Sequence, residues 1–313
     1  MSIYDALEVS SSERDSVVTI GVFDGVHRGH RHMLSRLVYE AERTGRISIV
    51  ITFRNHPASV LRPDSSPRLL TSVEERIRLI EETGVDLVLP VTFDLTLSKL
   101  SAREFAALLT ERMHMKMLVL GPDSAIGRER EGDISALTAV GEYMGFSVAS
   151  VAPLADKNGQ PIRSRAARKA LTDGDVARVS TLLGRSFALT GTVVRGQRRG
   201  GPLGFPTANL DLETGMAYPG DGIYATWAYV GETRHMAATS IGVRPTFDEG
   251  GHSIEAFIMD FDGDLYGREI RLEFVQRLRE ERKFDTVEGL QEQMARDVDR
   301  TRALLQTSQS VGA

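Results

Sequence analysis

The sequence predicts an α/β protein with an N-terminal Rossmann-like, doubly wound domain followed by an antiparallel β-barrel domain. Up to about residue 151, apolar runs rich in Val and Ile alternate with helical patterns, as in βαβ units around a parallel sheet. From residue 187 onward the apolar stretches are strand-like and are joined by Gly- and Pro-rich turns. The chain has 313 residues, which is enough for about two domains.

The elements of the first domain follow from these patterns. Strands are expected at 17–22, 48–53, 85–90, 117–121 and 146–151. Two of the intervening helices begin with capping-box patterns, Thr71-x-x-Glu74 and Ser101-x-x-Glu104. Right-handed crossovers then place helices on both faces of the sheet.

The second domain is expected to end in a helix over about 286–305, whose apolar positions fall broadly on one side. The fold class changes near residue 184, where the helical pattern gives way to strands. We therefore predict domains over 1–184 and 185–313.

Composition and charge limit the classes of function. A net charge of -5 and a pI of about 5.9 argue against broad nucleic-acid binding, which usually requires a basic surface. The absence of cysteine excludes disulfides, thiolate nucleophiles and cysteine-based zinc sites. No secretory signal or long apolar span is evident. We expect a cytoplasmic enzyme with small-molecule partners, no nucleic acid and no membrane, and the sequence leaves a homo-oligomer open.

The most specific N-terminal motif is Gly-Val-Phe-Asp-Gly-Val-His-Arg-Gly-His at 21–30, where the first expected strand ends and a helix begins. Ligands of open α/β sheets bind at the carboxyl ends of strands, and a helix N-terminus attracts phosphate. Gly29 permits close backbone approach, and His27 and His30 are one helical turn apart. The two imidazoles suit phosphate transfer. A pair of metal ligands or two ordinary turn histidines fit the spacing too.

A Gly-rich basic segment at 196–209 begins with Gly196, includes Arg198 and Gly204, and ends in Pro-Thr-Ala-Asn. Its backbone amides could wrap phosphates, although hairpin turns explain most loops of this kind. If the chain is extended, Thr207 and Asn209 point to one face and offer oxygen ligands to Mg²⁺.

Glu255 lies between apolar neighbours in a later strand-like stretch. One interpretation is an embedded carboxylate that serves as a general base. An exposed glutamate on the polar face of an alternating strand fits the pattern equally well. The remaining histidines have no partner motif, and for these we expect surface or structural roles.

Taken together, the motifs at 21–30, 52–57, 119–127, 204–209 and 254–257 resemble the bacterial bifunctional riboflavin kinase/FAD synthetase family over about residues 16–305. The resemblance implies that the first domain transfers AMP from ATP to FMN, giving FAD and pyrophosphate. The second domain would then phosphorylate riboflavin with ATP and Mg²⁺.

Residue roles follow from the same resemblance. In adenylyl transfer it implies catalytic roles for His27, His30 and Arg168. The implied nucleotide- or substrate-binding residues of this domain are Gly21, Phe23, Asp24, Gly29, Asp123 and Ser164. In the kinase it implies Glu255 as the catalytic base and Thr207 and Asn209 as the Mg²⁺ ligands. Gly196, Arg198 and Gly204 would bind the nucleotide.

The first domain also departs from the family. Ser124 and Ile126 replace two aromatic residues, and Arg163 and Arg165 replace small hydroxyl residues in a segment that contacts ATP phosphates in the family. Asn55 replaces a proline, which is a milder change. We favour the bifunctional enzyme. The alternatives are a riboflavin kinase with a weakened or inactive adenylyltransferase domain, a non-enzymatic flavin- or nucleotide-binding regulator, and a nucleotidyltransferase for another substrate.

Overall fold

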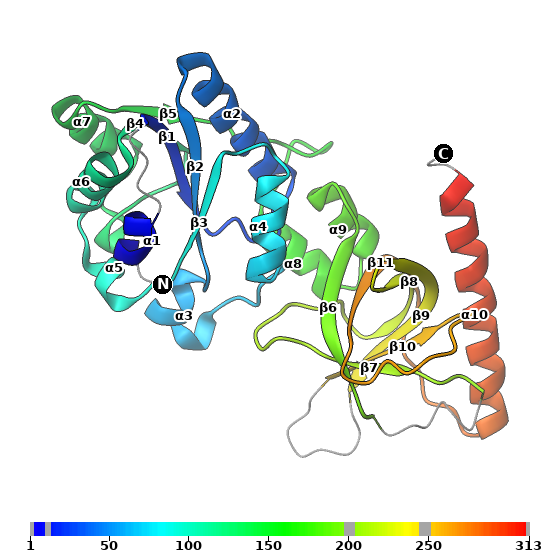
Figure 1. Cartoon of the computed structure of the whole chain (residues 1–313). Coiled ribbons are helices and arrows are strands. Elements are labelled where there is room, and N and C mark those ends of the chain that lie inside the picture. Colours follow the sequence, from blue (N-terminus) through cyan, green and yellow to red (C-terminus); the bar gives the residue numbers. More distant parts are fainter. Residues whose placement is uncertain (1–2, 10–13, 197–203, 244–251, 311–313) are drawn as a thin grey trace. The chain divides into compact units, whose positions relative to one another are not determined.

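A computed structural model describes residues 3–9, 14–196, 204–243 and 252–310 (Figure 1). The chain separates into two compact units, Met1–Ser164 and Arg165–Ala313. The predicted combination of a Rossmann-like parallel sheet and an antiparallel barrel is confirmed, with one fold in each unit.

The first unit is built on a parallel sheet in the order β3-β2-β1-β4-β5. Its strands are β1 (Ser16–Gly21), β2 (Ile47–Phe53), β3 (Leu87–Val91), β4 (Met115–Leu120) and β5 (Ser147–Ser150). Each overlaps one of the strands predicted from apolar runs. The order reverses between β1 and β4, and ligands of doubly wound sheets bind at such a point.

Helices cover both faces of this sheet because alternate strand residues point to opposite sides. Val18 belongs to the core with α1 (Ile3–Val9), α6 (Ala102–Met113) and α7 (Ile134–Met144). Its neighbour Val17 belongs to the core with α2 (Arg28–Thr44) and α4 (Val73–Glu81). The shorter helical segments are α3 (Pro57–Leu61), α5 (Leu95–Lys99), η1 (Pro63–Ser65) and η2 (Arg128–Arg130).

One predicted capping box is confirmed and the other is wrong by one residue. Ser101 and Glu104 form the reciprocal box at the start of α6. Helix α4 is instead capped by Ser72, whose hydroxyl accepts from the backbone N–H of Glu75 at 3.1 Å. Thr71 is buried, and its hydroxyl accepts from the backbone N–H of Gly25 at 3.1 Å, so it serves the loop after β1.

The second unit is a closed barrel in the order β10-β7-β6-β11-β8-β9, with antiparallel pairing between neighbouring strands. Its elements are α8 (Ser164–Thr172), α9 (Val176–Leu183), β6 (Phe187–Val194), β7 (Ala208–Asp211), β8 (Gly222–Val230), β9 (Thr233–Val243), β10 (His252–Ile258), β11 (Glu269–Arg279) and α10 (Val287–Ser310). Helix α10 is the predicted closing helix and begins within one residue of the expected start. It packs along β8, β9 and β11.

The division between the compact units falls after the first residue of α8, whereas the predicted boundary follows α9. Helix α9 packs on β6 and β11 of the barrel through its buried apolar face. The loop before β8 is also tied to α8, because the backbone N–H of Gly220 donates to the carbonyl of Leu171 at 2.9 Å. These contacts group both helices with the barrel in space, although the fold class of the sequence changes only after them.

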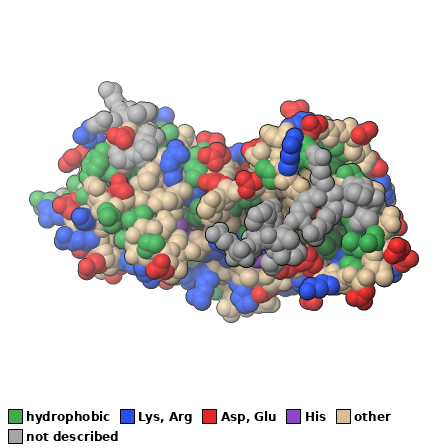
Figure 2. Space-filling model, turned by 90° about the horizontal axis from the view of Figure 1, so that it is seen from below, with side chains coloured by type: hydrophobic (Ala, Val, Ile, Leu, Met, Phe, Trp, Pro, Cys, Tyr) green, Lys and Arg blue, Asp and Glu red, His purple; other side chains and the backbone are tan. Residues whose placement is uncertain are grey.

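On the face drawn in Figure 2, Lys and Arg side chains alternate with Asp and Glu and do not gather into one basic area. Within the described residues, no helix is both long and apolar enough to cross a bilayer.

A buried arginine ties the ligand-binding edge of the first sheet to α4. Arg76 has no exposed surface. Its Nη1 donates to the carbonyl oxygens of Val22 at 2.9 Å and Phe53 at 2.6 Å. These carbonyls lie at the carboxyl ends of β1 and β2, so the guanidinium joins neighbouring strand ends to one helix.

We expect Arg76→Met to lower the free energy of unfolding of the first unit by about 2–4 kcal/mol, because two buried carbonyls lose a charged donor. Urea unfolding followed by far-UV circular dichroism would report the loss. The only tryptophan, Trp227, lies in β8, so its fluorescence reports the barrel and should keep its midpoint. Arg78→Met, on the exposed side of the same helix, is the control. Equal losses in both variants would contradict the prediction.

Candidate functional site

The first unit holds a cavity of about 360 Å³, within the usual range for small-molecule pockets. Its walls come from the segment after β1, the start of α2 and the loops after β4 and β5. The cavity therefore lies where the strand order reverses, at the carboxyl ends of β1 and β4.

His27 and His30 form a pair on the wall of this cavity. His27 is the N-cap of α2, and its Nδ1 accepts from the backbone N–H of His30 at 3.2 Å. The two rings stack with centroids 3.6 Å apart, and Phe23 meets the His30 ring edge-on at 5.3 Å. Because Nδ1 of His27 is an acceptor, Nε2 holds the proton when this ring is neutral.

Three of the other predicted residues build the same wall. Gly29 lies so close to its neighbours that a Cβ there would be 3.0 Å from the Ile162 carbonyl oxygen and 3.1 Å from the His27 ring. A Cβ on Gly21 would be 3.2 Å from the Phe23 ring. Phe23 itself has a left-handed φ of 51°, so the turn after β1 is tightly bent.

Asp24 is a buried residue of the 21–30 turn, and the nucleotide contact implied for it stays a prediction. Its side chain is 1% exposed, and it does not line the cavity. One carboxylate oxygen accepts from the backbone N–H groups of Leu70 at 2.8 Å and Thr71 at 3.2 Å. Asp24 therefore fixes the 21–30 turn to the segment before α4, which is a structural role that burial imposes on a charged group.

The loops after β4 and before α8 bring the next predicted residues together. Asp123 and Ser164 both line the cavity. The Ser164 hydroxyl donates to the carbonyl oxygen of Asp24 at 2.9 Å. Arg168 lies on α8, in the second compact unit, and is not among the cavity-lining residues.

The departures from the family differ in position. Ser124 lines the cavity, whereas Ile126 packs against the hydrophobic core and pairs with Gly132 in an isolated bridge. Only one of the two lost aromatics therefore changes the cavity wall. Asn55 bridges backbone groups, because its side chain both donates to and accepts from Phe93 at 2.9 Å.

The second unit has its own cavity, between the outer face of the barrel and the C-terminal segment. Polar groups of Thr207, Glu255 and Glu281 line it. Its apolar wall is formed by Phe205, Ile223, Phe257, Phe284, Leu290, Met294 and Val298.

Glu255 reaches this cavity because of the alternation along β10. Ile254, Ala256 and Ile258 are buried, whereas Glu255 and Phe257 line the cavity on the other side of the strand. The Glu255 Oε2 atom accepts from the Thr207 hydroxyl at 3.2 Å. The strand interpretation and the catalytic interpretation are thus compatible, since the outward face carrying Glu255 is part of a cavity.

Asn209 stands directly opposite Glu255 in the pairing of β7 with β10. Its side chain is 5% exposed. Gly196 lies against it, because a Cβ at that position would be 2.3 Å from Nδ2 of Asn209. Gly204 has a left-handed φ of 86°, as expected for a glycine turn. Arg198 lies outside the described residues.

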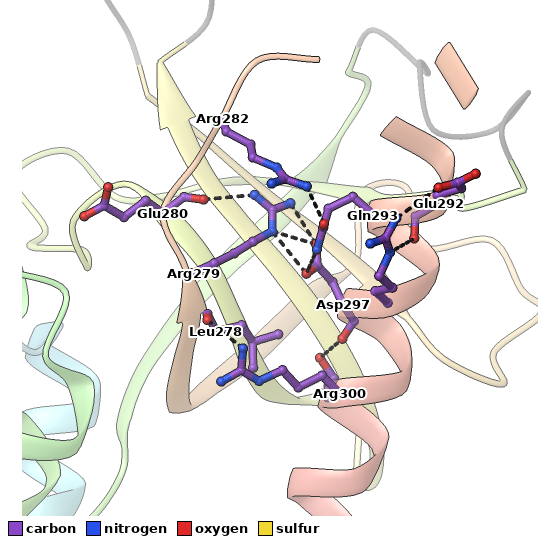
Figure 3. A network of polar contacts seen from close by, with 10 residues as sticks. Leu278, Arg279, Glu280, Arg282, Glu292, Gln293, Asp297 and Arg300 are labelled. Atoms are coloured by element: carbon purple, nitrogen blue, oxygen red, sulfur yellow. Dashed lines mark hydrogen bonds and ion pairs between the residues drawn. The ribbon is translucent and has the colours of Figure 1, made fainter. Parts of the chain in front are cut away.

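Sequence reasoning missed a polar network between the end of β11 and α10 (Figure 3). Arg279 donates from Nε and Nη2 to Asp297 at distances of 2.7–3.1 Å, and Asp297 is 6% exposed. Gln293 donates to Asp297 at 2.9 Å, and Arg282 donates to Gln293. In the sequence, the sign of this network is Asp297, an acidic residue next to the apolar positions of the last helix. The network fixes α10 at the wall of the cavity.

Glu281 is a second carboxylate that the sequence did not single out. Its carboxylate lies against Gly242, where a Cβ would approach Oε2 to 2.2 Å. Desolvation, followed by the charges of Asp221 and Glu255, raises the pKa of Glu281.

Comparisons with known proteins cover both units. A family model for FAD synthetase matches residues 9–166, and one for riboflavin kinase matches residues 183–305. The bifunctional riboflavin kinase/FMN adenylyltransferase of Escherichia coli (strain K12) is 38% identical over 283 residues, with 90% of each chain covered. The protein of the same name from Bacillus subtilis (strain 168) is 32% identical, with 92% of each chain covered.

A solved structure supports the same assignment at the level of fold. The crystal structure of a protein described as a macrolide-efflux protein from Streptococcus pneumoniae is 31% identical and has a TM-score of 0.86. The match covers 95% of this chain and 96% of that one. Both family models thus match in order, and the curated relatives align along almost their whole length. The chain belongs to the bifunctional riboflavin kinase/FMN adenylyltransferase family.

Proposed function

We propose that this protein phosphorylates riboflavin to FMN with ATP and Mg²⁺ and then adenylylates FMN to FAD. The observation that supports this most directly is that each compact unit has a separate cavity lined by residues of its own motifs, His27 and His30 in the first and Thr207 and Glu255 in the second. We assign it small-molecule substrates and a cytoplasmic location, and its net charge of -5 argues against a nucleic-acid partner.

In the kinase reaction, the primary hydroxyl of the ribityl chain attacks the γ-phosphorus of ATP. The bond from that phosphorus to the β,γ-bridging oxygen breaks, and ADP leaves. The attacking group is a neutral alcohol, so a base near it accelerates transfer. Glu255 accepts the hydroxyl proton and is oriented by the Thr207 hydroxyl at 3.2 Å. Phe257, Leu290 and Met294 offer an apolar wall suited to the flavin ring.

The residues around Glu255 fit a magnesium nucleotide. Thr207 and Asn209 provide neutral oxygen donors, which a hard cation prefers. Among the described residues, no group of three or more His, Asp or Glu side chains could hold a metal without further ligands. Phosphate oxygens of the nucleotide would then complete the ligand set of Mg²⁺. When bound, the cation neutralises charge on the phosphates.

In adenylyl transfer, a phosphate oxygen of FMN attacks the α-phosphorus of ATP. The bond from the α-phosphorus to the α,β-bridging oxygen breaks, and pyrophosphate leaves. The FMN phosphate is already ionised near neutral pH, so positioning and charge stabilisation are sufficient. His27, His30 and the N-terminal amides of α2 would stabilise the developing negative charge.

The alternative is a riboflavin kinase with a weakened adenylyltransferase domain. The observation that favours it is Ser124, which leaves the cavity wall without an aromatic at that position. Chromatography of flavins decides between the two. Protein incubated with ATP, Mg²⁺ and FMN should yield FAD if the enzyme is bifunctional. Riboflavin conversion that stops at FMN, with no FAD from supplied FMN, would favour the alternative.

Replacing the proposed base tests the kinase assignment. We expect Glu255→Gln to lower kcat for riboflavin phosphorylation by about 10²–10⁴-fold, because the amide cannot accept the hydroxyl proton. FAD formation from FMN should persist, since it uses the other cavity. Glu269→Gln, on the exposed start of β11, is the control. Loss of both activities in Glu255→Gln would contradict separate sites.

A cap-preserving substitution tests the role of the first histidine. Asparagine is a good N-cap, so His27→Asn should keep α2 capped while removing the imidazole. We expect the rate of FMN adenylylation to fall about a hundredfold or more, with riboflavin phosphorylation unchanged. His32→Asn on the exposed side of the same helix is the control. An adenylylation rate equal to that of the control would exclude a catalytic role for His27.

A further inference from the structure

The residues on both sides of Arg163 lie against the 21–30 turn. On one side, the Ile162 carbonyl oxygen lies 3.0 Å from the position that a Cβ on Gly29 would take. On the other, the Ser164 hydroxyl donates to the Asp24 carbonyl at 2.9 Å. Gly29 and Asp24 both belong to the 21–30 turn. The backbone of Arg163 therefore lies near this turn, and Arg163 lines the same cavity as His27 and His30.

Arg163 forms an ion pair with Asp123 across this wall. Its Nη2 lies 2.6 Å from the Oδ2 of Asp123, on the loop after β4. Two hydrogen bonds stabilise that loop. The backbone N–H of Ser124 donates to the Gly121 carbonyl at 3.0 Å, and the Arg130 side chain donates to the Asp123 carbonyl at 2.9 Å. Both residues of the ion pair line the cavity.

Another anion can readily replace Asp123 as the partner of Arg163. The side chains of Arg163 and Asp123 are 57% and 68% exposed, so water screens their attraction strongly. A guanidinium binds a phosphate group with paired, charge-assisted hydrogen bonds, which are stronger than an exposed contact to one carboxylate oxygen. A polyphosphate entering the cavity would therefore compete successfully with Asp123 for Arg163.

We propose that Arg163 is a polyphosphate-binding residue of the adenylyltransferase cavity and that Asp123 is its exchangeable partner. Arg163 releases Asp123 and engages the phosphates of ATP, or the pyrophosphate product, beside the start of α2. Asp123 thus opposes binding of the substrate and aids release of the product. The inference rests on the proposed adenylyl transfer.

The test compares three variants of the full-length protein. Arg163→Ser removes the proposed ligand, and Asp123→Asn removes the competing charge at nearly constant shape. Arg128→Ser is the matched control, because this arginine is 59% exposed, pairs with Glu131 and does not line the cavity. Two quantities are measured, the KM for ATP in FAD formation from FMN and the Kd for inorganic pyrophosphate by calorimetry.

We expect Arg163→Ser to raise both constants roughly tenfold or more, as loss of a charge-assisted bond predicts. Asp123→Asn should lower both about two- to fivefold, which corresponds to releasing an exposed ion pair. Arg128→Ser should leave both unchanged. Unchanged constants in Arg163→Ser, or raised constants in Asp123→Asn, would overturn the inference.

Calorimetry separates this inference from the proposed function. If the wild-type protein forms no FAD but Arg163→Ser still weakens pyrophosphate binding, adenylyl transfer fails and the phosphate-binding role of Arg163 stands. If the wild-type protein forms FAD and Arg163→Ser changes neither constant, adenylyl transfer stands and the role of Arg163 fails.

Discussion

The buried contacts of Asp24 hold the first candidate site together. Its carboxylate accepts from two backbone N–H groups before α4, and its carbonyl accepts from Ser164, the first residue of α8. One residue thereby ties the 21–30 turn to two segments that are distant in sequence. A buried carboxylate needs such partners to offset its desolvation. Arg76 adds a second constraint from α4 by binding the carbonyls at the ends of β1 and β2. The contacts of Asp24 and Arg76 fix the backbone of the turn that precedes α2, and they thereby position His27 and His30.

The second site depends on a comparable constraint. The nearly buried Asp297 holds Arg279 at the end of β11 to α10, and Gln293 links the same carboxylate to Arg282 (Figure 3). An ion pair of this kind is costly to break on one side, since the remaining charge would stay buried. The helix therefore stays over the outer face of the barrel, where Glu255 and Phe257 would otherwise face solvent. The apolar wall and the base are brought together by this packing.

Much of the fold was predictable because it is specified locally. Apolar runs located the strands of the sheet, and the capping box at Ser101 marked the start of α6. Thr71 shows where such reasoning stops. Thr71 and its neighbour Ser72 both fit the sequence pattern of a helix N-cap. The Thr71 hydroxyl instead accepts from the backbone N–H of Gly25, a residue distant in sequence, and Ser72 caps the helix. The sequence pattern alone could not show which of the two hydroxyls makes the cap. Helix α9 contacts β6 and β11, and Gly220 bonds to Leu171 of α8, so the compact second unit includes both helices, whereas the boundary predicted from the change of sequence pattern follows them.

The sequence by itself determined which chemical groups are present and which motifs they form. It also determined that His27 and His30 lie a turn apart at the start of a helix and that Glu255 lies in a strand-like stretch. Tertiary structure decided which of these groups face a cavity. It buried Asp24, placed Ser124 but not Ile126 on a cavity wall, and set Asp123 opposite Arg163. The physical reason is that helical and strand periodicities give the face on which a side chain lies. What covers that face depends on contacts between residues far apart in the chain.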